Sequence, residues 1–66
     1  MIVTINGEPR EIAHAKNVAD LIEELGLPAP AILVEHNGVA LRREEWAARV
    51  VAEGDRIELV RIVAGG

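Results

Sequence analysis

The chain begins with a short apolar run that is followed at once by a turn signal. Residues 1–5 are mostly apolar and β-branched, which is typical of a strand. Asn6-Gly7 comes next and favours a type I′ hairpin turn, because both residues tolerate a positive φ. Residues 8–13 can supply the return strand, with Pro9 near its start or on an unpaired edge, since proline has no N–H to donate. The pattern predicts an antiparallel hairpin.

The apolar period then changes from that of a strand to that of a helix. Asn17 is a suitable N-cap, and Asp20 follows where a negative charge favours a helix N-terminus. Gly26 suits the left-handed position after a helix, and the two prolines that follow it prevent continuation. A helix is therefore predicted over residues 18–25, with four apolar residues at helical spacing: Val18, Leu21, Ile22 and Leu25.

The second half of the chain returns to strands. A strand is predicted over residues 31–36, and Asn37-Gly38 is a second hairpin-type turn into a short strand at 39–41. Residues 42–48 predict a short helical turn, and Gly54-Asp55 is a turn that precedes a long apolar run at 56–63. The predicted order is β-β-α-β-β-β, with no repeat and no interdomain linker.

The two faces of the last strand are expected to differ. A period of two places Ile57 and Leu59 beneath the helix and Val60 and Ile62 on the opposite face. A chain with one main helix has little left to cover that second face, so Val60 and Ile62 are candidates for docking a partner protein. The alternative is burial under the segment that holds Trp46, a residue expected to anchor the aliphatic core.

Length and composition limit the kinds of protein that this can be. A chain of 66 residues is expected to form one domain that buries only about 60% of its unfolded surface, so a deep active-site cleft is not expected. The net charge of −4 and the scattered basic residues argue against nucleic-acid binding. No apolar run reaches the roughly 18 residues of a membrane span, and the N-terminus does not resemble a signal peptide. We expect a soluble, cytoplasmic protein.

Side-chain chemistry offers little for catalysis. Ser and Cys are absent, Thr4 is the one hydroxyl nucleophile, and His14 and His36 lie in separate segments without an orienting acid in the sequence pattern. No ligand spacing indicates a metal site, and the neighbouring Glu pairs are expected to be solvated charge. The sequence therefore predicts that the chain is not an enzyme.

The chain ends in Val63-Ala64-Gly65-Gly66, and the last two glycines have no turn or cap to explain them. Two glycines in succession can thread a narrow channel of a partner enzyme and present an accessible terminal carboxylate. A frayed, merely disordered end is the plain alternative. The diglycine is the strongest candidate for chemistry in this sequence.

Several motifs in the C-terminal third, in their order, make the chain similar to a known family. These motifs are Arg43-Glu44-Glu45-Trp46, Val50-Val51, Gly54-Asp55 and Ile62-Val63-Ala64-Gly65-Gly66. Over essentially its whole length the chain resembles the sulfur carrier proteins of thiamine biosynthesis. The resemblance implies a ubiquitin-like β-grasp fold of the α+β class, with a mixed sheet of four to five strands packed on one main helix. It implies a single domain over residues 1–66 with a flexible tail at 64–66.

The resemblance also implies a mechanism. In this family an adenylating, E1-like partner uses ATP and Mg²⁺ to activate the terminal glycine, here Gly66. Sulfur from a donor such as a cysteine desulfurase then forms a thiocarboxylate, which delivers sulfur to thiazole synthase. Gly65 would permit entry into the partner's active site and Ala64 would keep the approach slim, while the chain itself binds no cofactor or metal. Because the sequence stops at Gly66, no proteolytic maturation is expected.

Two kinds of alternative stay open at this point. Diglycine carriers of the same fold serve molybdopterin synthesis, tRNA thiolation or cysteine synthesis, although the short length and the context of Trp46 favour thiamine. A β-grasp interaction module that makes no chemical use of its diglycine is the other alternative.

Overall fold

The computed structural model describes residues 1–63 and contains five strands, one α-helix and two 3₁₀-helices within them. The elements are β1 (Ile2–Ile5), β2 (Glu8–Glu11), α1 (Val18–Glu24), η1 (Ala29–Ala31), β3 (Ile32–His36), β4 (Val39–Leu41), η2 (Arg43–Ala48) and β5 (Arg56–Arg61). The predicted order of elements is confirmed. Several bounds differ from the predicted ones, because β2 ends at Glu11, α1 at Glu24 and β5 at Arg61. The proline-rich link after α1 also forms the 3₁₀-helix η1.

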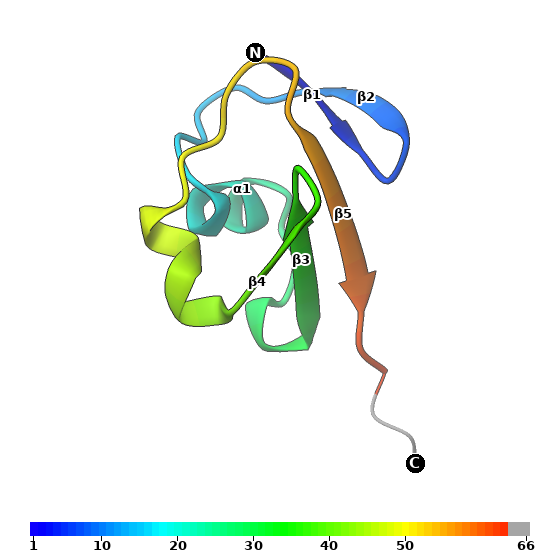
Figure 1. Cartoon of the computed structure of the whole chain (residues 1–66), viewed down its shortest axis with the longest axis vertical. Helices are drawn as coiled ribbons and strands as arrows, with labels where there is room; N and C mark the ends of the chain where they lie inside the picture. The colour runs from blue at the N-terminus through cyan, green and yellow to red at the C-terminus, as the bar shows by residue number, and fades with distance from the viewer. Residues whose placement is uncertain (64–66) are drawn as a thin grey trace.

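The five strands form one mixed sheet in the order β2-β1-β5-β3-β4. β1 and β5 run parallel, whereas the other three neighbouring pairs are antiparallel. The last strand in the sequence is therefore the middle strand of the sheet, and it runs toward the lower end of the molecule in Figure 1. Pro9 lies on the edge strand β2, where its missing N–H breaks no ladder in the sheet interior.

Both Asn-Gly turns have the predicted backbone. The φ angles are 50° and 84° at Asn6 and Gly7, and 49° and 85° at Asn37 and Gly38. Positive φ at both central residues is what a type I′ turn requires, and its twist matches that of the strands it joins. These two turns set the pairing of β1 with β2 and of β3 with β4.

Local hydrogen bonds fix both ends of α1. The Asn17 side chain accepts from the Asp20 N–H at 2.8 Å, as expected of an N-cap. At the other end Gly26 has a φ of 70°, its N–H donates to the Glu23 carbonyl, and the Leu27 N–H donates to the Ile22 carbonyl. This pair of bonds is a Schellman motif, so the predicted glycine stop is confirmed.

The core lies between α1, η2 and one face of the sheet. Trp46 is only 3% exposed and packs in this core, which confirms its predicted role as an anchor. Its indole N–H is buried without a hydrogen-bond partner in the described part of the chain. The other buried apolar residues are Val3, Ile12, Ala15, Val18, Leu21, Ile22, Ile32, Val34, Leu41, Val51 and Ile57.

Two carboxylates bind backbone N–H groups of other segments, one in a loop and one at the start of β1. Glu24 accepts from the backbone N–H groups of Ala13, His14 and Ala15, each at 2.8 Å, and so fixes the link between β2 and α1. Glu53 accepts from the Ile2 N–H through both carboxylate oxygens. Both contacts satisfy backbone donors that would otherwise need water.

Candidate functional site

The tail residues predicted to carry the chemistry, Ala64, Gly65 and Gly66, lie outside the described residues. The structure does describe the segment that leads to them. β5 pairs with β3 as far as Arg61, opposite Ile32, and one more backbone bond runs from the Ile62 N–H to the Ala31 carbonyl at 2.7 Å. Val63 follows and is 81% exposed. The tail thus starts from the end of the middle strand, which is paired on both sides nearer its start.

The predicted docking residues Val60 and Ile62 are 57% and 48% exposed. The alternative, burial under the segment that holds Trp46, is wrong, because Trp46 packs in the core with α1 on the other face of the sheet. Leu33 lies directly opposite Val60 in the β3–β5 register and is also half exposed. We call Leu33, Val60 and Ile62 the apolar patch.

Leu33 is a member of this patch that the sequence reasoning missed. The signal was present, since Leu33 alternates with the buried residues Ile32 and Val34 and so faces away from the core. A period of two over residues 32–36 predicts an exposed Leu33, and the β3–β5 register places it opposite Val60.

Two asparagine side chains hold β5 in place. Asn6 both accepts from the Leu59 N–H at 2.7 Å and donates to the Leu59 carbonyl at 3.1 Å. Asn37 accepts from the Arg56 N–H at 2.8 Å. These are the asparagines of the two hairpin turns, so each turn also binds the strand that leads to the tail.

A buried histidine on β3 joins two other segments near the start of β5. His36 is 4% exposed, its Nε2 lies 2.7 Å from Asp55 Oδ2, and its Nδ1 accepts from Arg49 Nε at 2.8 Å. Because Nδ1 is an acceptor, the proton of the neutral ring is assigned to Nε2, which donates to Asp55. The expectation of no orienting acid near either histidine is wrong for His36, because Asp55 reaches it only in the folded chain.

Asp55 accepts hydrogen bonds from more than the histidine. Partial burial raises the pKa of Asp55, but the bonds from the Ala52 N–H, His36 and Asn37 outweigh that effect and hold its pKa below the ordinary value. Both ring nitrogens of His36 are occupied, and among the described residues no hydroxyl bonds to it. The network therefore holds structure together and offers no free base.

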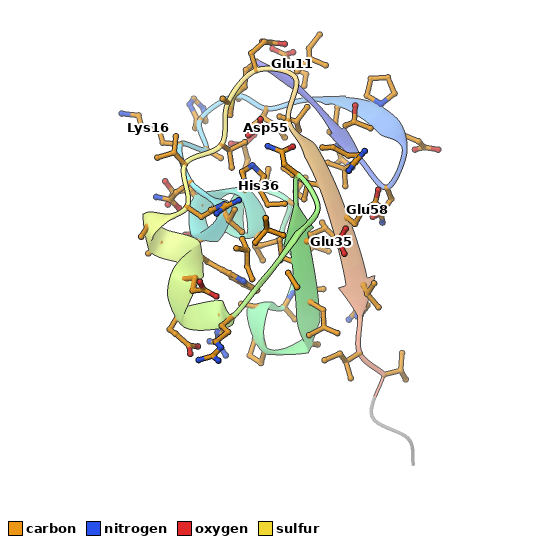
Figure 2. The ribbon with its side chains drawn as sticks, viewed as in Figure 1. Glu11, Lys16, Glu35, His36, Asp55 and Glu58 are labelled. Atoms are coloured by element: carbon orange, nitrogen blue, oxygen red, sulfur yellow. The ribbon has the colours of Figure 1, made fainter. Side chains whose placement is uncertain are left out.

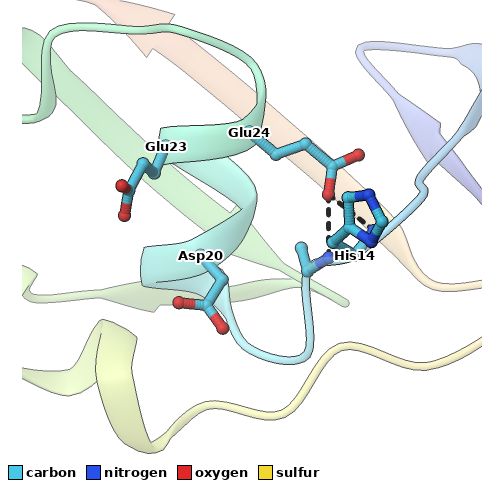
Figure 3. A pocket seen from close by; sticks show the side chains of 5 residues that line it. His14, Asp20, Glu23 and Glu24 are labelled. Atoms are coloured by element: carbon cyan, nitrogen blue, oxygen red, sulfur yellow. Dashed lines mark hydrogen bonds between the residues drawn. The ribbon is translucent and has the colours of Figure 1, made fainter.

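A shallow hollow beside α1 is lined mainly by acidic side chains. It measures about 310 Å³ and is lined by His14, Ala15, Asp20, Glu23 and Glu24. Figure 3 shows that the Glu24 carboxylate turns to the backbone at His14, where it is already engaged. Within residues 1–63 no group of three His, Asp or Glu side chains is placed to hold a metal ion. No helix in that part of the chain is long and apolar enough to cross a membrane.

These features define a class of protein: a small mixed-sheet domain whose middle strand leads directly to a diglycine end, as in ubiquitin-like proteins. The model of the ThiS family matches residues 3–66. The chain belongs to the ThiS family. A crystal structure of the thiamine biosynthesis protein ThiS from Geobacter metallireducens superimposes with a TM-score of 0.84 at 36% identity, covering 100% of both chains. The predicted β-grasp fold is confirmed.

Curated relatives agree with this assignment. The sulfur carrier protein ThiS of Escherichia coli is 30% identical over 66 residues and covers 100% of both chains. The ThiS protein of Thermus thermophilus is 32% identical over 65 residues, 98% of this chain and 100% of that one. The prediction of a sulfur carrier of thiamine biosynthesis is confirmed.

A different kind of relative contains a similar segment within a longer chain. The thiazole synthase of Paramagnetospirillum magneticum is 33% identical over 66 residues, which is 100% of this chain but 20% of that protein. The chain thus spans one fifth of that relative's length. In such a protein the carrier-like segment and the synthase are one polypeptide.

Proposed function

We propose that this chain carries sulfur as a thiocarboxylate on Gly66 and donates it to thiazole formation. The observation that carries the proposal is the family match, which extends to residue 66 and so includes the terminal diglycine. A terminal carboxyl has a pKa near 3.5, so at neutral pH it is ionised and a poor electrophile. It must be activated before sulfur can replace an oxygen.

The proposed reaction has two steps on the same carbonyl. In the first step a Gly66 carboxylate oxygen bonds to the α-phosphorus of ATP, and pyrophosphate leaves. In the second step a sulfur nucleophile attacks the acyl-adenylate and AMP leaves: sulfide gives the thiocarboxylate directly, whereas a donor persulfide gives an acyl disulfide that a thiol then reduces to the thiocarboxylate. Gly65 lets the chain enter the partner's active site because it has no Cβ, and Ala64 adds only a methyl group.

The proposed partners supply everything that the chain lacks. ATP and Mg²⁺ belong to an adenylating, E1-like enzyme, and a donor such as a cysteine desulfurase provides the sulfur. Thiazole synthase is the acceptor, a proposal supported by the synthases that contain a carrier-like segment. We assign the chain no catalytic activity, bound cofactor or metal of its own, no nucleic-acid partner, and a cytoplasmic location where ATP is available.

Docking is proposed to use the exposed face of β5. Val60 and Ile62 are large apolar side chains that remain about half exposed. Exposed apolar groups clustered on one face mark contact surfaces more often than scattered ones do. Val60 is on β5 and Ile62 directly follows this strand, so a partner bound there is close to the point where the tail begins.

The first prediction concerns the mass of the chain. Incubation with ATP, Mg²⁺, the adenylating enzyme and a sulfur donor should add about 16 Da, because sulfur replaces one oxygen. Deletion of Gly66 should abolish this shift and thiazole formation. The melting temperature should stay unchanged, since a terminal glycine buries almost nothing.

Intact-protein mass spectrometry and a thiazole assay separate the alternatives. A shift in mass without thiazole formation would indicate a carrier for another pathway. No shift with any adenylating enzyme would indicate an interaction module. Thiazole formation supported by the chain that lacks Gly66 would contradict the proposal directly.

A further inference from the structure

Two carboxylates lie directly opposite each other on the exposed face of the sheet. The β3–β5 register pairs Glu35 with Glu58, and Figure 2 shows the two side chains next to each other over these strands. Directly opposed residues of an antiparallel pair have Cβ atoms about 4.5–5.5 Å apart, and like charges at that spacing are unfavourable. A strand pair in the middle of a sheet thus holds two negative charges together.

Nothing within the described chain compensates this pair. Over residues 1–63 neither carboxylate takes part in a hydrogen bond or an ion pair, whereas Glu24 and Glu53 both bind backbone N–H groups. Arg56 precedes Glu58 on the same strand face, but its guanidinium lies beside the turn at Gly38. The charges of Glu35 and Glu58 therefore face outward without a cation.

The acidic pair adjoins the apolar patch. Leu33 opposes Val60 in the same register, two residues along each strand from Glu35 and Glu58. Both pairs share the face that turns away from α1, since Ile32, Val34 and Ile57 occupy the buried face. One continuous surface on the two middle strands β5 and β3 thus offers an apolar pair and, beside it, a pair of carboxylates.

We propose that thiazole synthase docks on this surface with an arginine or lysine side chain between Glu35 and Glu58 and an apolar group over Leu33 and Val60. The inference rests on the proposed function and adds which kinds of side chain on thiazole synthase contact this surface. A cation between two carboxylates forms charge-assisted bonds to both and removes their repulsion. Arginine suits the position best, because its planar fork can reach two acceptors.

The choice of thiazole synthase as occupant comes from the relatives in which the two proteins are one chain. Two thiazole synthases contain a segment similar to all of this chain, at 33% and 32% identity. Covalent linkage makes a contact between two modules intramolecular, so selection can retain it even when the contact itself is weak. A small surface with an apolar pair and a charged pair fits such a contact.

The test measures the affinity of the full chain for thiazole synthase from the same organism. The variant E35Q/E58Q should bind at least tenfold more weakly at low salt and lose most of the salt dependence. The matched control E23Q/E44Q removes the same charge from two exposed residues on α1 and η2 and should change the affinity less than threefold. Thermal melting should show E35Q/E58Q to be at least as stable as the parent chain.

A further variant distinguishes whether the acidic pair, the apolar patch or neither contributes to the binding of thiazole synthase. Val60→Glu should weaken binding at any salt concentration, because it disrupts the apolar patch. Equal affinities for E35Q/E58Q and E23Q/E44Q, with V60E still defective, would overturn the role of the acidic pair and leave the proposed docking intact. Normal binding by V60E as well would overturn the docking surface, whereas the gain in mass at Gly66 tests the carrier function independently.

Discussion

At the scale of single residues, the buried side chain of His36 connects β3 with two other parts of the fold. It is on β3, it donates to Asp55 in the turn before β5, and it accepts from Arg49 after η2. A buried polar ring costs free energy unless its nitrogens are paired, and here both are. The same bonds that satisfy the ring fix the positions of three segments.

Removing this ring should therefore be costly. His36→Ala removes two hydrogen bonds, leaves a cavity, and leaves Asp55 and Arg49 each without one hydrogen-bond partner. We therefore expect a loss of about 3 kcal/mol in the free energy of unfolding. For a domain of this size that corresponds to a drop of roughly 12–24 °C in melting temperature. His14 is exposed, and His14→Ala is the matched control, expected to cost under about 0.5 kcal/mol. Equal melting temperatures for the two variants would contradict the structural role of His36.

At the scale of elements, each Asn-Gly hairpin turn has a second task beyond reversing the chain. The Asn6 amide pairs with both backbone groups of Leu59, and the Asn37 amide accepts from the Arg56 N–H. The two turns therefore contact β5 from its two flanks within the sheet, since β1 and β3 are its two neighbours. The Asn6 and Asn37 side chains therefore continue the hydrogen bonding to β5 just beyond its backbone pairing with β1 and β3.

Replacing either asparagine by glycine separates these two tasks. Glycine accepts the positive φ of the turn, so Asn6→Gly and Asn37→Gly keep the hairpins but lose the side-chain bonds. Each should cost about 1–2 kcal/mol. Amide hydrogen exchange gives a reciprocal control: N6G should deprotect Leu59 and leave Arg56 protected, whereas N37G should do the opposite. Loss of protection along the whole of β5 in both variants would show general destabilisation instead.

Much of this fold was predictable because its signals are local. The Asn-Gly turns, the Asn17 cap and the Gly26 stop each depend on neighbours within a few residues, and all four have the predicted geometry. The contacts that were not predicted join distant segments. Asn6 and Leu59 are 53 positions apart, and the bond of His36 to Asp55 exists only once β3 and β5 pair. Local propensity carries no information about such pairs.

In the candidate site, too, local signals were predictable and contacts between distant segments were not. A period of two was enough to place Val60 and Ile62 away from the helix. Whether anything covered them depended on which face Trp46 takes, and that is decided by packing across the whole core. The acidic pair likewise requires the β3–β5 register, because Glu35 and Glu58 are far apart in the sequence.

At the scale of the whole molecule, the acidic side chains contribute to stability through the backbone groups they hold. The hydrogen bond from the Ala13 N–H is the largest effect on Glu24, and with that from His14 it keeps the pKa of Glu24 below its ordinary value of 4.5. The pKa of Asp55 likewise lies below its ordinary value of 3.8, since its hydrogen bonds outweigh partial burial. Each carboxylate takes up a proton more readily in the unfolded chain than in the folded one.

Acid should therefore unfold the protein in a defined range of pH. A group with a lowered folded pKa contributes stability above its unfolded value, and that contribution is lost as the pH falls toward the folded value. The free energy of unfolding should be steady above the ordinary value of 4.5 for Glu24 and should decrease as the pH falls below it and then below 3.8 for Asp55.

Denaturant titrations from about pH 6 down to about pH 3 can assign part of this loss to one carboxylate. Glu24→Gln should be less stable than the parent near pH 6 and approach it near pH 3, because protonation removes the same charge from the parent. Glu23→Gln changes the adjacent exposed carboxylate, which binds no backbone group among the described residues, and should follow the parent profile throughout. If the profile of E24Q instead ran parallel to the parent, the three N–H bonds at Glu24 would not be the source of the acid sensitivity, and the loop between β2 and α1 would have to be held by other contacts.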